Sequence, residues 1–253
     1  MSWQPTDCHA HSTHSDGSLS VAEVAERGPE LGVRVSVSDH ISRDSPTTLV
    51  SLEAIDTYLA DLEKHDVLRG GEFCWHDALW RELPATLVSR FTHRLGSLHS
   101  IQLPGGSSCR AFVREFPVGV TPQMYVEGLV ASLEQLAHEM PVDILAHPTI
   151  IPPAARALDP ETLWTEALEE RVVSALAASG IAFELSSRYP PHRRLVERAA
   201  SAGIRFSLGS DGHVREQVGV IAAPLALARS IGVKDEDLYD PEVHGSRTGA
   251  FGR

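Results

Sequence analysis

The sequence predicts an α/β fold in which parallel strands alternate with helices and close into a barrel. Short strand candidates recur along the chain, helical stripes separate them, and no linker, repeat or low-complexity segment interrupts the alternation. The chain has 253 residues, a length that such barrels commonly occupy as a single unit. We therefore expect one domain over residues 1–253, with a core at about 5–230 and a less ordered tail at about 235–253.

Seven segments have the short apolar or alternating pattern of strands. The clearest is VRVSVS, in which apolar and polar residues alternate as they do along a half-buried strand. The predicted strands lie within residues 5–10, 33–38, 67–75, 93–100, 142–148, 181–187 and 204–213. Strands that alternate with helices are typical of a parallel sheet.

Helical spacing accounts for most of the segments between these strands. The first helix is expected at 20–31, because Ser20 and Glu23 have the spacing of a capping box. Apolar residues at helical spacing follow in two further stripes, Leu52–Ile55–Leu59–Leu62 and Tyr125–Leu129–Leu133–Leu136. Weaker helical segments are expected at 77–91, 160–179 and 192–202, and loops at 103–108 (LPGGSS) and 149–155 (TIIPPAA).

Composition and charge exclude several classes of protein. The formal net charge of −12 disfavours binding to nucleic acid or to anionic lipid. No apolar run approaches the ~18 residues of a membrane span, and the first residues do not resemble a secretory signal, so we expect a cytoplasmic protein. Cys8, Cys74 and Cys109 lie far apart without a CxxC pair, which predicts reduced thiols rather than a disulfide framework or a thiolate zinc site.

Polar residues gather at the downstream ends of the predicted strands. In a barrel of parallel strands these ends surround one mouth, where active sites are built. Side chains two positions apart on a strand point the same way, so His9 pairs with His11, and Asp211 with His213. Other strand ends supply His40, Glu72, His99 and His147. So many imidazoles and carboxylates together predict a metal centre for zinc, manganese or iron.

Six short motifs follow one another along the chain: CHAHSTHSDG, VSVSDH, GGE, GSLHS, LAHP and LGSDGH. From about residue 7 to 219 this series resembles the motif series of the PHP (polymerase and histidinol phosphatase) family. The resemblance implies a distorted, TIM-like barrel of seven strand and helix units, with a trinuclear metal site that hydrolyses phosphoesters. Two departures, SDGH where the family often has SDAH and SVSDH where it often has TDH, remove no ligand.

The resemblance also implies a distribution of ligands over two to three divalent ions. The first ion would be held by His9, His11, Glu72 and Asp211. Glu72 would bridge to a second ion, held also by His99 and His147, and the third would be held by Asp16, His40 and His213, with His14 as the alternative to Asp16. Glu72, Asp211 and His213 are accordingly the expected catalytic residues.

Two further aspartates are expected behind these ligands. Asp7 and Asp39 would orient imidazoles through the ring nitrogen that does not bind metal. Asp39 has an equally good alternative interpretation as a helix or turn cap.

Such a site implies hydrolysis of a small phosphomonoester by a metal-bridging hydroxide. The compact length and the segment SLGSDGHVREQVG are most similar to the histidinol-phosphatase branch, so the expected partner is a small phosphorylated metabolite similar to histidinol phosphate. Alternatives are a nucleotide phosphatase or phosphodiesterase of the same family, a metal-dependent hydrolase of an amide or lactone, and a non-catalytic metal-binding protein.

Arg188 is the predicted phosphate-binding residue. It directly follows the sixth predicted strand and should lie at the same rim as His147 and Asp211. An arginine there would form bidentate hydrogen bonds that a lysine cannot reproduce. An ordinary surface position for Arg188 is the alternative, with Arg43, Arg156 and Arg193 as weaker candidates for this role.

Overall fold

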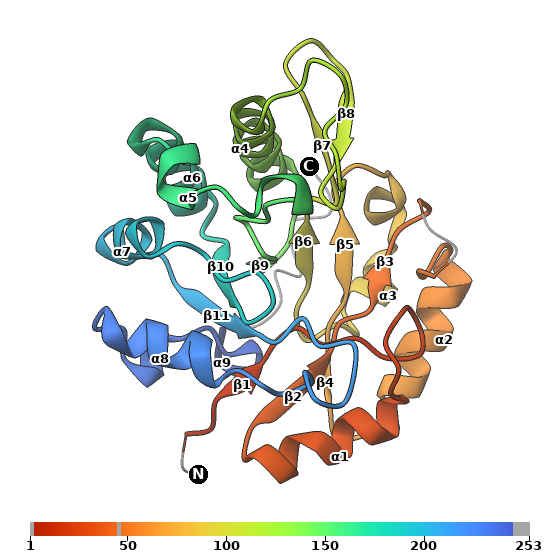
Figure 1. Cartoon of the computed structure of the whole chain (residues 1–253). Coiled ribbons are helices and arrows are strands. Elements are labelled where there is room, and N and C mark those ends of the chain that lie inside the picture. The colour runs from red at the N-terminus through yellow and green to blue at the C-terminus, as the bar shows by residue number, and fades with distance from the viewer. Residues whose placement is uncertain (1–2, 45–46, 245–253) are drawn as a thin grey trace.

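The computed structural model describes residues 3–44 and 47–244 of the chain. Its main feature is a parallel sheet with the strand order β3-β5-β6-β9-β10-β11-β1-β2-β4 (Figure 1). These strands are β1 (Thr6–Asp7), β2 (Arg34–Val37), β3 (His40–Ile41), β4 (Leu68–Arg69), β5 (Glu72–Cys74), β6 (Leu95–Ser97), β9 (Ile144–Leu145), β10 (Ala182–Ser186) and β11 (Phe206–Gly209).

The two ends of this strand order meet, so the sheet closes. β2 and β3 follow one another in a single extended segment, and so do β4 and β5. The two segments lie side by side, since Ser36 pairs with Leu68 and His40 pairs with Glu72. The result is a distorted barrel of seven strand positions, as the sequence predicted, and each of the seven predicted segments contains a strand.

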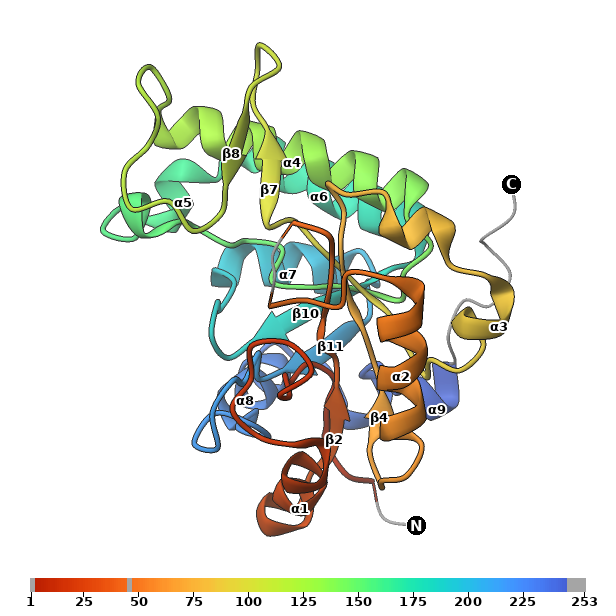
Figure 2. The ribbon, with the colours of Figure 1, turned by 90° about the vertical axis from the view of Figure 1, so that its right-hand side faces the viewer.

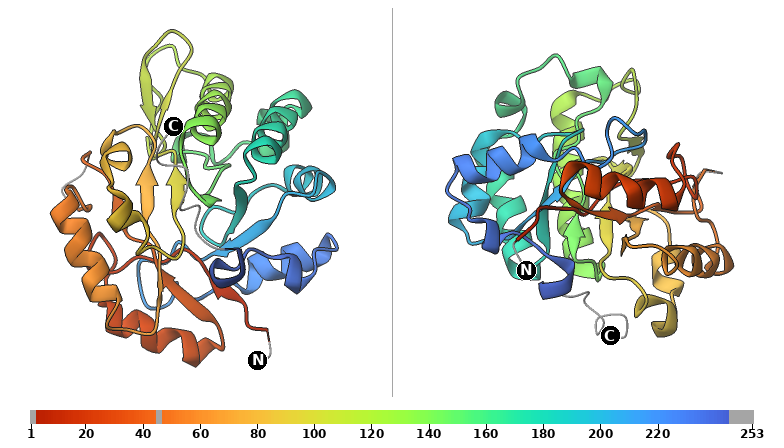
Figure 3. Two further views of the ribbon diagram at one scale, coloured as in Figure 1. Left: turned by 180° about the vertical axis from the view of Figure 1, so that it is seen from behind. Right: turned by 90° about the horizontal axis from the view of Figure 1, so that it is seen from below.

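Helices surround the outside of the barrel (Figures 1 and 3). They are α1 (Val21–Leu31), α2 (Leu52–Leu62), α3 (Ala85–Val88), α4 (Pro122–Glu139), α5 (Pro160–Leu163), α6 (Glu166–Ser179), α7 (Arg193–Ser201), α8 (Ala222–Ser230) and α9 (Pro241–His244), with 3₁₀ turns η1 (Leu79–Glu82), η2 (Pro153–Ala155) and η3 (Asp235–Asp237). The predicted capping box begins α1, because Ser20 and Glu23 each accept a hydrogen bond from the other's backbone N–H. No helix in the described ranges is both long and apolar enough to cross a membrane.

Successive side chains on a barrel strand point alternately toward the helical layer and into the barrel interior. On β10, Phe183 and Leu185 belong to the apolar core and Phe183 packs edge-on against Phe206 of β11 at 5.8 Å between ring centroids. Glu184 lies between them and points the opposite way, into the interior. The same alternation on β5 places Phe73 in the apolar core and Glu72 in the interior.

Four features differ from the sequence-based expectations. The predicted loop 103–108 joins an antiparallel hairpin of β7 (Ser100–Gln102) and β8 (Ser108–Arg110), which projects from the barrel beside α4 (Figure 2). Segment 77–91 holds only η1 and α3, and α8 was not predicted.

The tail predicted from about residue 235 is the fourth difference, and this prediction is wrong for residues 235–244. They form η3 and α9, and Leu238 and Tyr239 are buried. Tyr239 is anchored by its backbone N–H, which donates to the carbonyl of Phe206 at 2.7 Å. Residues 245–253 of the predicted tail lie outside the described residues.

Candidate metal centre

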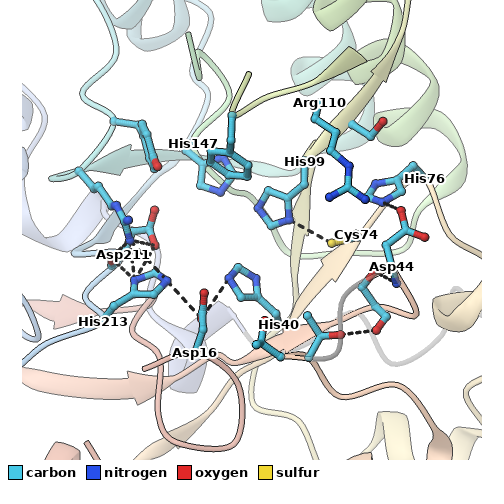
Figure 4. Close-up of a pocket in the computed structure, with 17 residues that line it drawn as sticks. Asp16, His40, Asp44, Cys74, His76, His99, Arg110, His147, Asp211 and His213 are labelled. Atoms are coloured by element: carbon cyan, nitrogen blue, oxygen red, sulfur yellow. Dashed lines mark hydrogen bonds and ion pairs between the residues drawn. The ribbon is translucent and has the colours of Figure 1, made fainter. Parts of the chain in front are cut away.

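The predicted site residues meet in a cavity of about 330 Å³ at the carboxyl ends of the barrel strands. Figure 4 shows imidazoles and carboxylates from separate strand ends facing one another across this cavity. Its lining includes Asp16, His40, His99, His147, Asp211 and His213, with Arg188 among the remaining residues. His9, His11 and Glu72 lie beneath, fully buried.

The carboxylate of Glu72 occupies the centre of this arrangement. Its Oε1 lies 2.9 Å from Nε2 of His147 and 3.2 Å from Nε2 of His99. Its Oε2 lies 2.5 Å from Nδ1 of His40 and 3.6 Å from Nε2 of His9. Burial opposes ionisation of Glu72, but the surrounding imidazoles outweigh it and hold the pKa of the carboxyl well below its usual value.

A second group joins the end of β1 to the end of β11. Nε2 of His11 lies 3.1 Å from Nε2 of His9 and 3.3 Å from Oδ1 of Asp211. Burial lowers the pKa of His11 to about 3, which keeps its imidazole neutral near pH 7. Burial opposes ionisation of Asp211, yet contact with His11 lowers the pKa of this carboxyl. Neutral imidazole and ionised carboxylate are the forms that bind metals.

The third group lies nearer to solvent. Oδ1 of Asp16 is 3.5 Å from Nε2 of His40 and 3.3 Å from Nε2 of His213. His14 points elsewhere, with its Nε2 2.9 Å from Oδ2 of Asp61. The geometry therefore brings Asp16 rather than His14 to the cluster.

The residues present fit divalent metal ions. Three sets each offer ligand atoms within 4.8 Å of one another: His9, His11 and Asp211; His40, Glu72 and His99; and His11, Asp16, His40 and His213. Nδ1 of His40 and Oε2 of Glu72, which face each other inside the cluster, are buried without a hydrogen-bond partner among the described residues. Such orphaned polar atoms are costly unless something binds them. With His147 beside Glu72, the structure brings together all nine predicted ligands, although His40 lies closer to Glu72 than the predicted grouping implies.

Backbone strain coincides with two of these residues. His147 has a φ of 30° and Asp211 a φ of 50°, and in the described ranges no other residue except glycine has a positive φ. The two residues follow β9 and β11 closely. Positive φ is unfavourable for such side chains and persists at sites where the surrounding structure enforces it.

Asp7 and Asp39 do not orient imidazoles, so that prediction is wrong. Asp7 accepts hydrogen bonds from the backbone N–H groups of His9, Ser210 and Gly219 at 2.8–3.1 Å. Asp39 accepts from the backbone N–H and hydroxyl of Ser12, which matches its alternative interpretation as a turn cap. Both aspartates hold backbone that carries ligands rather than the ligands themselves.

Two buried groups that do contact imidazoles were missed from the sequence. Oε1 of Glu184 lies 2.7 Å from Nδ1 of His9, and Oε2 accepts the backbone N–H of His147 at 2.5 Å. Sγ of Cys74 lies 3.0 Å from Nδ1 of His99. The available signal for Glu184 was an acidic residue in the middle of the apolar strand IAFELSS.

Arg188 lies at the rim of the cavity, where the sequence placed it. Its Nη1 is 3.4 Å from the carbonyl oxygen of Asp211 and 2.6 Å from Nδ1 of His213. The guanidinium groups of Arg188 and Arg156 lie 5.6 and 6.0 Å from the ring centre of Tyr189. Two cationic groups therefore flank one aromatic side chain at the mouth.

The other two arginine candidates are paired with carboxylates away from the cavity lining. Arg43 forms a bidentate pair with Glu82 at 2.6 and 2.7 Å. Arg193 pairs with Glu197 at 2.6 Å, one helical turn along α7. Neither guanidinium faces the imidazole cluster.

Two solved structures have the same fold as this chain. One is a protein of Listeria monocytogenes assigned as the histidinol phosphatase HisK, with a TM-score of 0.70 at 15% identity over 85% of this chain and 97% of that one. The other is the histidinol phosphate phosphatase HisK of Lactococcus lactis subsp. lactis, with a TM-score of 0.67 at 15% identity over 92% of this chain and 95% of that one. The Lactococcus structure is a complex with zinc, L-histidinol and phosphate.

The structural match confirms the barrel that the resemblance to the PHP family implied. At 15% identity the match establishes a common fold, and the role of each site residue is a separate question. Models of known protein families and curated protein sequences give no match to this chain.

Glu184 provides a test of how the ligands are held. In Glu184→Gln an amide replaces the carboxylate, so it can accept from His9 or from the His147 backbone through only one oxygen. We expect zinc affinity, measured by competition with a chelator, to fall about 10- to 100-fold. Glu170→Gln, at an exposed position of α6, is the matched control. Equal zinc affinity in both variants would show that Glu184 does not support the centre.

Proposed function

We propose that this chain is a metal-dependent phosphatase that hydrolyses a small phosphomonoester similar to histidinol phosphate. The observation that carries the proposal is a buried carboxylate surrounded by imidazoles, directly beneath a cavity with Arg188 at its rim. The complex of the structurally similar Lactococcus phosphatase with zinc, L-histidinol and phosphate supports the same class of substrate. Three buried free cysteines are in keeping with a cytoplasmic location.

We infer that the nine clustered residues hold two to three zinc, manganese or iron ions in the distribution expected from the sequence. Such ions, when bound, lower the pKa of coordinated water and neutralise phosphoryl oxygens. Glu72 would contribute to two of the positions, because one of its oxygens lies beside His99 and His147 and the other beside His9 and His40. Asp211 and His213 line the cavity beside Arg188. These three residues are the proposed catalytic residues.

The rim accounts for how an acidic chain could hold a phosphate ester. Arg188 presents a guanidinium beside Asp211 and His213, in reach of a phosphoryl group above the ligand cluster. Phe112 and Tyr189 provide an aromatic wall, with ring centroids 5.5 Å from His99 and 5.5 Å from His147 respectively. The flat part of an alcohol leaving group, such as the imidazole ring of histidinol, would pack against this wall.

A phosphate-release screen tests the reaction. The full chain, loaded in turn with manganese, zinc or iron, is offered histidinol phosphate, other phosphorylated metabolites, nucleotides, and a panel of amides and lactones. We expect the highest kcat/KM for small phosphomonoesters. Turnover of nucleotides, amides or lactones alone would show that the proposed substrate class is wrong. If the metal-loaded protein hydrolyses none of the compounds, a non-catalytic metal-binding role would be favoured.

Glu72→Gln tests the ligand distribution. Wild-type protein grown in metal-replete medium should contain two to three divalent ions per chain by elemental analysis. The variant should lose at least one ion and most activity, because the amide cannot supply a charged oxygen to two positions. Glu170→Gln should retain the wild-type metal content. A Glu72→Gln protein with unchanged metal content and rate would remove the bridging assignment.

Arg188→Lys tests phosphate binding at the rim. A lysine keeps the charge but loses the bidentate geometry, so kcat/KM should fall about tenfold, equivalent to about 1.4 kcal/mol, with metal content unchanged. Arg193→Lys is the control, because Arg193 pairs with Glu197 instead of lining the cavity. Wild-type kinetics would place Arg188 outside the substrate site, and joint loss of metal and activity would indicate a structural role.

A further inference from the structure

Cys74 stands behind one of the candidate ligands in the barrel interior. It is the last residue of β5, two positions after Glu72, so both side chains point to the same side of the strand. It pairs across the sheet with Ser97 of β6, two positions before His99. This register brings the thiol of one strand to the imidazole that follows the next strand.

The His99 ring is held from both edges. Its Nδ1 lies 3.0 Å from the sulfur of Cys74, and its Nε2 lies 3.2 Å from Oε1 of Glu72. A ring nitrogen that binds metal needs a free electron pair, so the proton of neutral imidazole must then reside on the other nitrogen. When Nε2 binds a metal ion, the proton therefore belongs on Nδ1, where the sulfur can accept its hydrogen bond.

His9 shows the same arrangement with a different acceptor. Its Nδ1 contacts Oε1 of Glu184 at 2.7 Å, and its Nε2 faces Glu72. Carboxylates and backbone carbonyls are the usual acceptors behind metal-binding histidines. At His99 a buried thiol, 3% exposed, occupies that place.

We propose that Cys74 is a positioning residue for His99, whose Nδ1–H hydrogen bond it accepts, so that Nε2 is directed toward the metal position beside Glu72. The inference rests on the proposed metal centre and adds a residue that neither the ligand set nor the strand-end pattern contains. Cys74 also lines the cavity (Figure 4), but in this role it acts through His99. Its effect should appear as affinity for one ion rather than as general loss of structure.

Stepwise zinc titration of the full chain against a chelator tests this role. Cys74→Val and Cys74→Ala both remove the acceptor but differ in volume, whereas Cys74→Ser keeps an acceptor. We expect Val and Ala to weaken one zinc-binding step by about 10- to 100-fold, and Ser to retain most of that affinity. The step is identified as the one abolished in His99→Ala, and the remaining steps serve as internal references.

Cys109→Val is the matched control, because Cys109 is another buried thiol, on β8, whose sulfur lies 3.7 Å from the carbonyl of Arg110 rather than against an imidazole. It should leave every zinc-binding step unchanged. Wild-type affinity in both Cys74→Val and Cys74→Ala would overturn the inference. Equal loss in Cys74→Ser and Cys74→Val, or a tenfold difference between Val and Ala, would overturn it in favour of packing. A wild-type chain that binds fewer than two ions would instead refute the metal centre of the proposed function.

Discussion

The buried carboxylate of Glu72 is the constraint on which the rest of the barrel depends. An ionised carboxylate loses several kcal/mol of effective solvation on burial, and only nearby positive charge and hydrogen-bond donors offset this loss. Here five imidazoles from four strand ends surround it, those of His9, His11, His40, His99 and His147. The closed parallel sheet brings these ends around one point. Imidazoles can stabilise the anion as protonated cations or through metal ions. Burial keeps His11 neutral, whereas the acidic groups beside His9 and His99 outweigh burial and raise the pKa of both imidazoles. Divalent ions would take over this role, because they supply the charge while the ligand imidazoles stay neutral.

The strained backbone at His147 and Asp211 is held by buried groups that serve a second purpose. Glu184 accepts the N–H of His147 with one oxygen and contacts the ring of His9 with the other. The N–H of Asp211 donates to the carbonyl of His9 at 2.8 Å, and Asp7 accepts from the adjacent Ser210. Gly209 makes this packing possible, since a Cβ there would come within 2.0 Å of Glu184 Oε1. The cost of positive φ, about 1–3 kcal/mol per residue, is thus offset by contacts that also fix ligand direction.

The sequence was sufficient for the strands and for the residues at their ends because both depend on local pattern. Period-two alternation marks each strand, and parallel strands present their downstream ends to one mouth. Which side chains form hydrogen bonds with the ligand residues depends instead on the register between strands far apart in the chain. Asp7 and Glu184 are both acidic residues on barrel strands, yet only the pairing of β1 and β10 with β11 determines that one meets backbone and the other an imidazole. The ordered structure of residues 235–244 likewise depends on long-range contacts, such as the hydrogen bond from the Tyr239 N–H to the Phe206 carbonyl. Composition cannot indicate such contacts.

The net charge of the chain and the charges around the cavity favour different conclusions about the ligand. The formal charge of −12 repels an extended polyanion, because many phosphates would approach the acidic surface at once. A single phosphoryl group in the cavity meets a different field, since charges farther than about 10 Å through solvent are largely screened at 0.1 M salt. Within that distance the carboxylates of Asp16 and Asp211 are matched by imidazoles, and the guanidinium of Arg188 lies at the rim. The charges around the cavity therefore allow a small phosphate ester to bind, while the net charge of the chain disfavours nucleic acid. The acidity of the chain thus excludes large polyanions but not a single phosphate group.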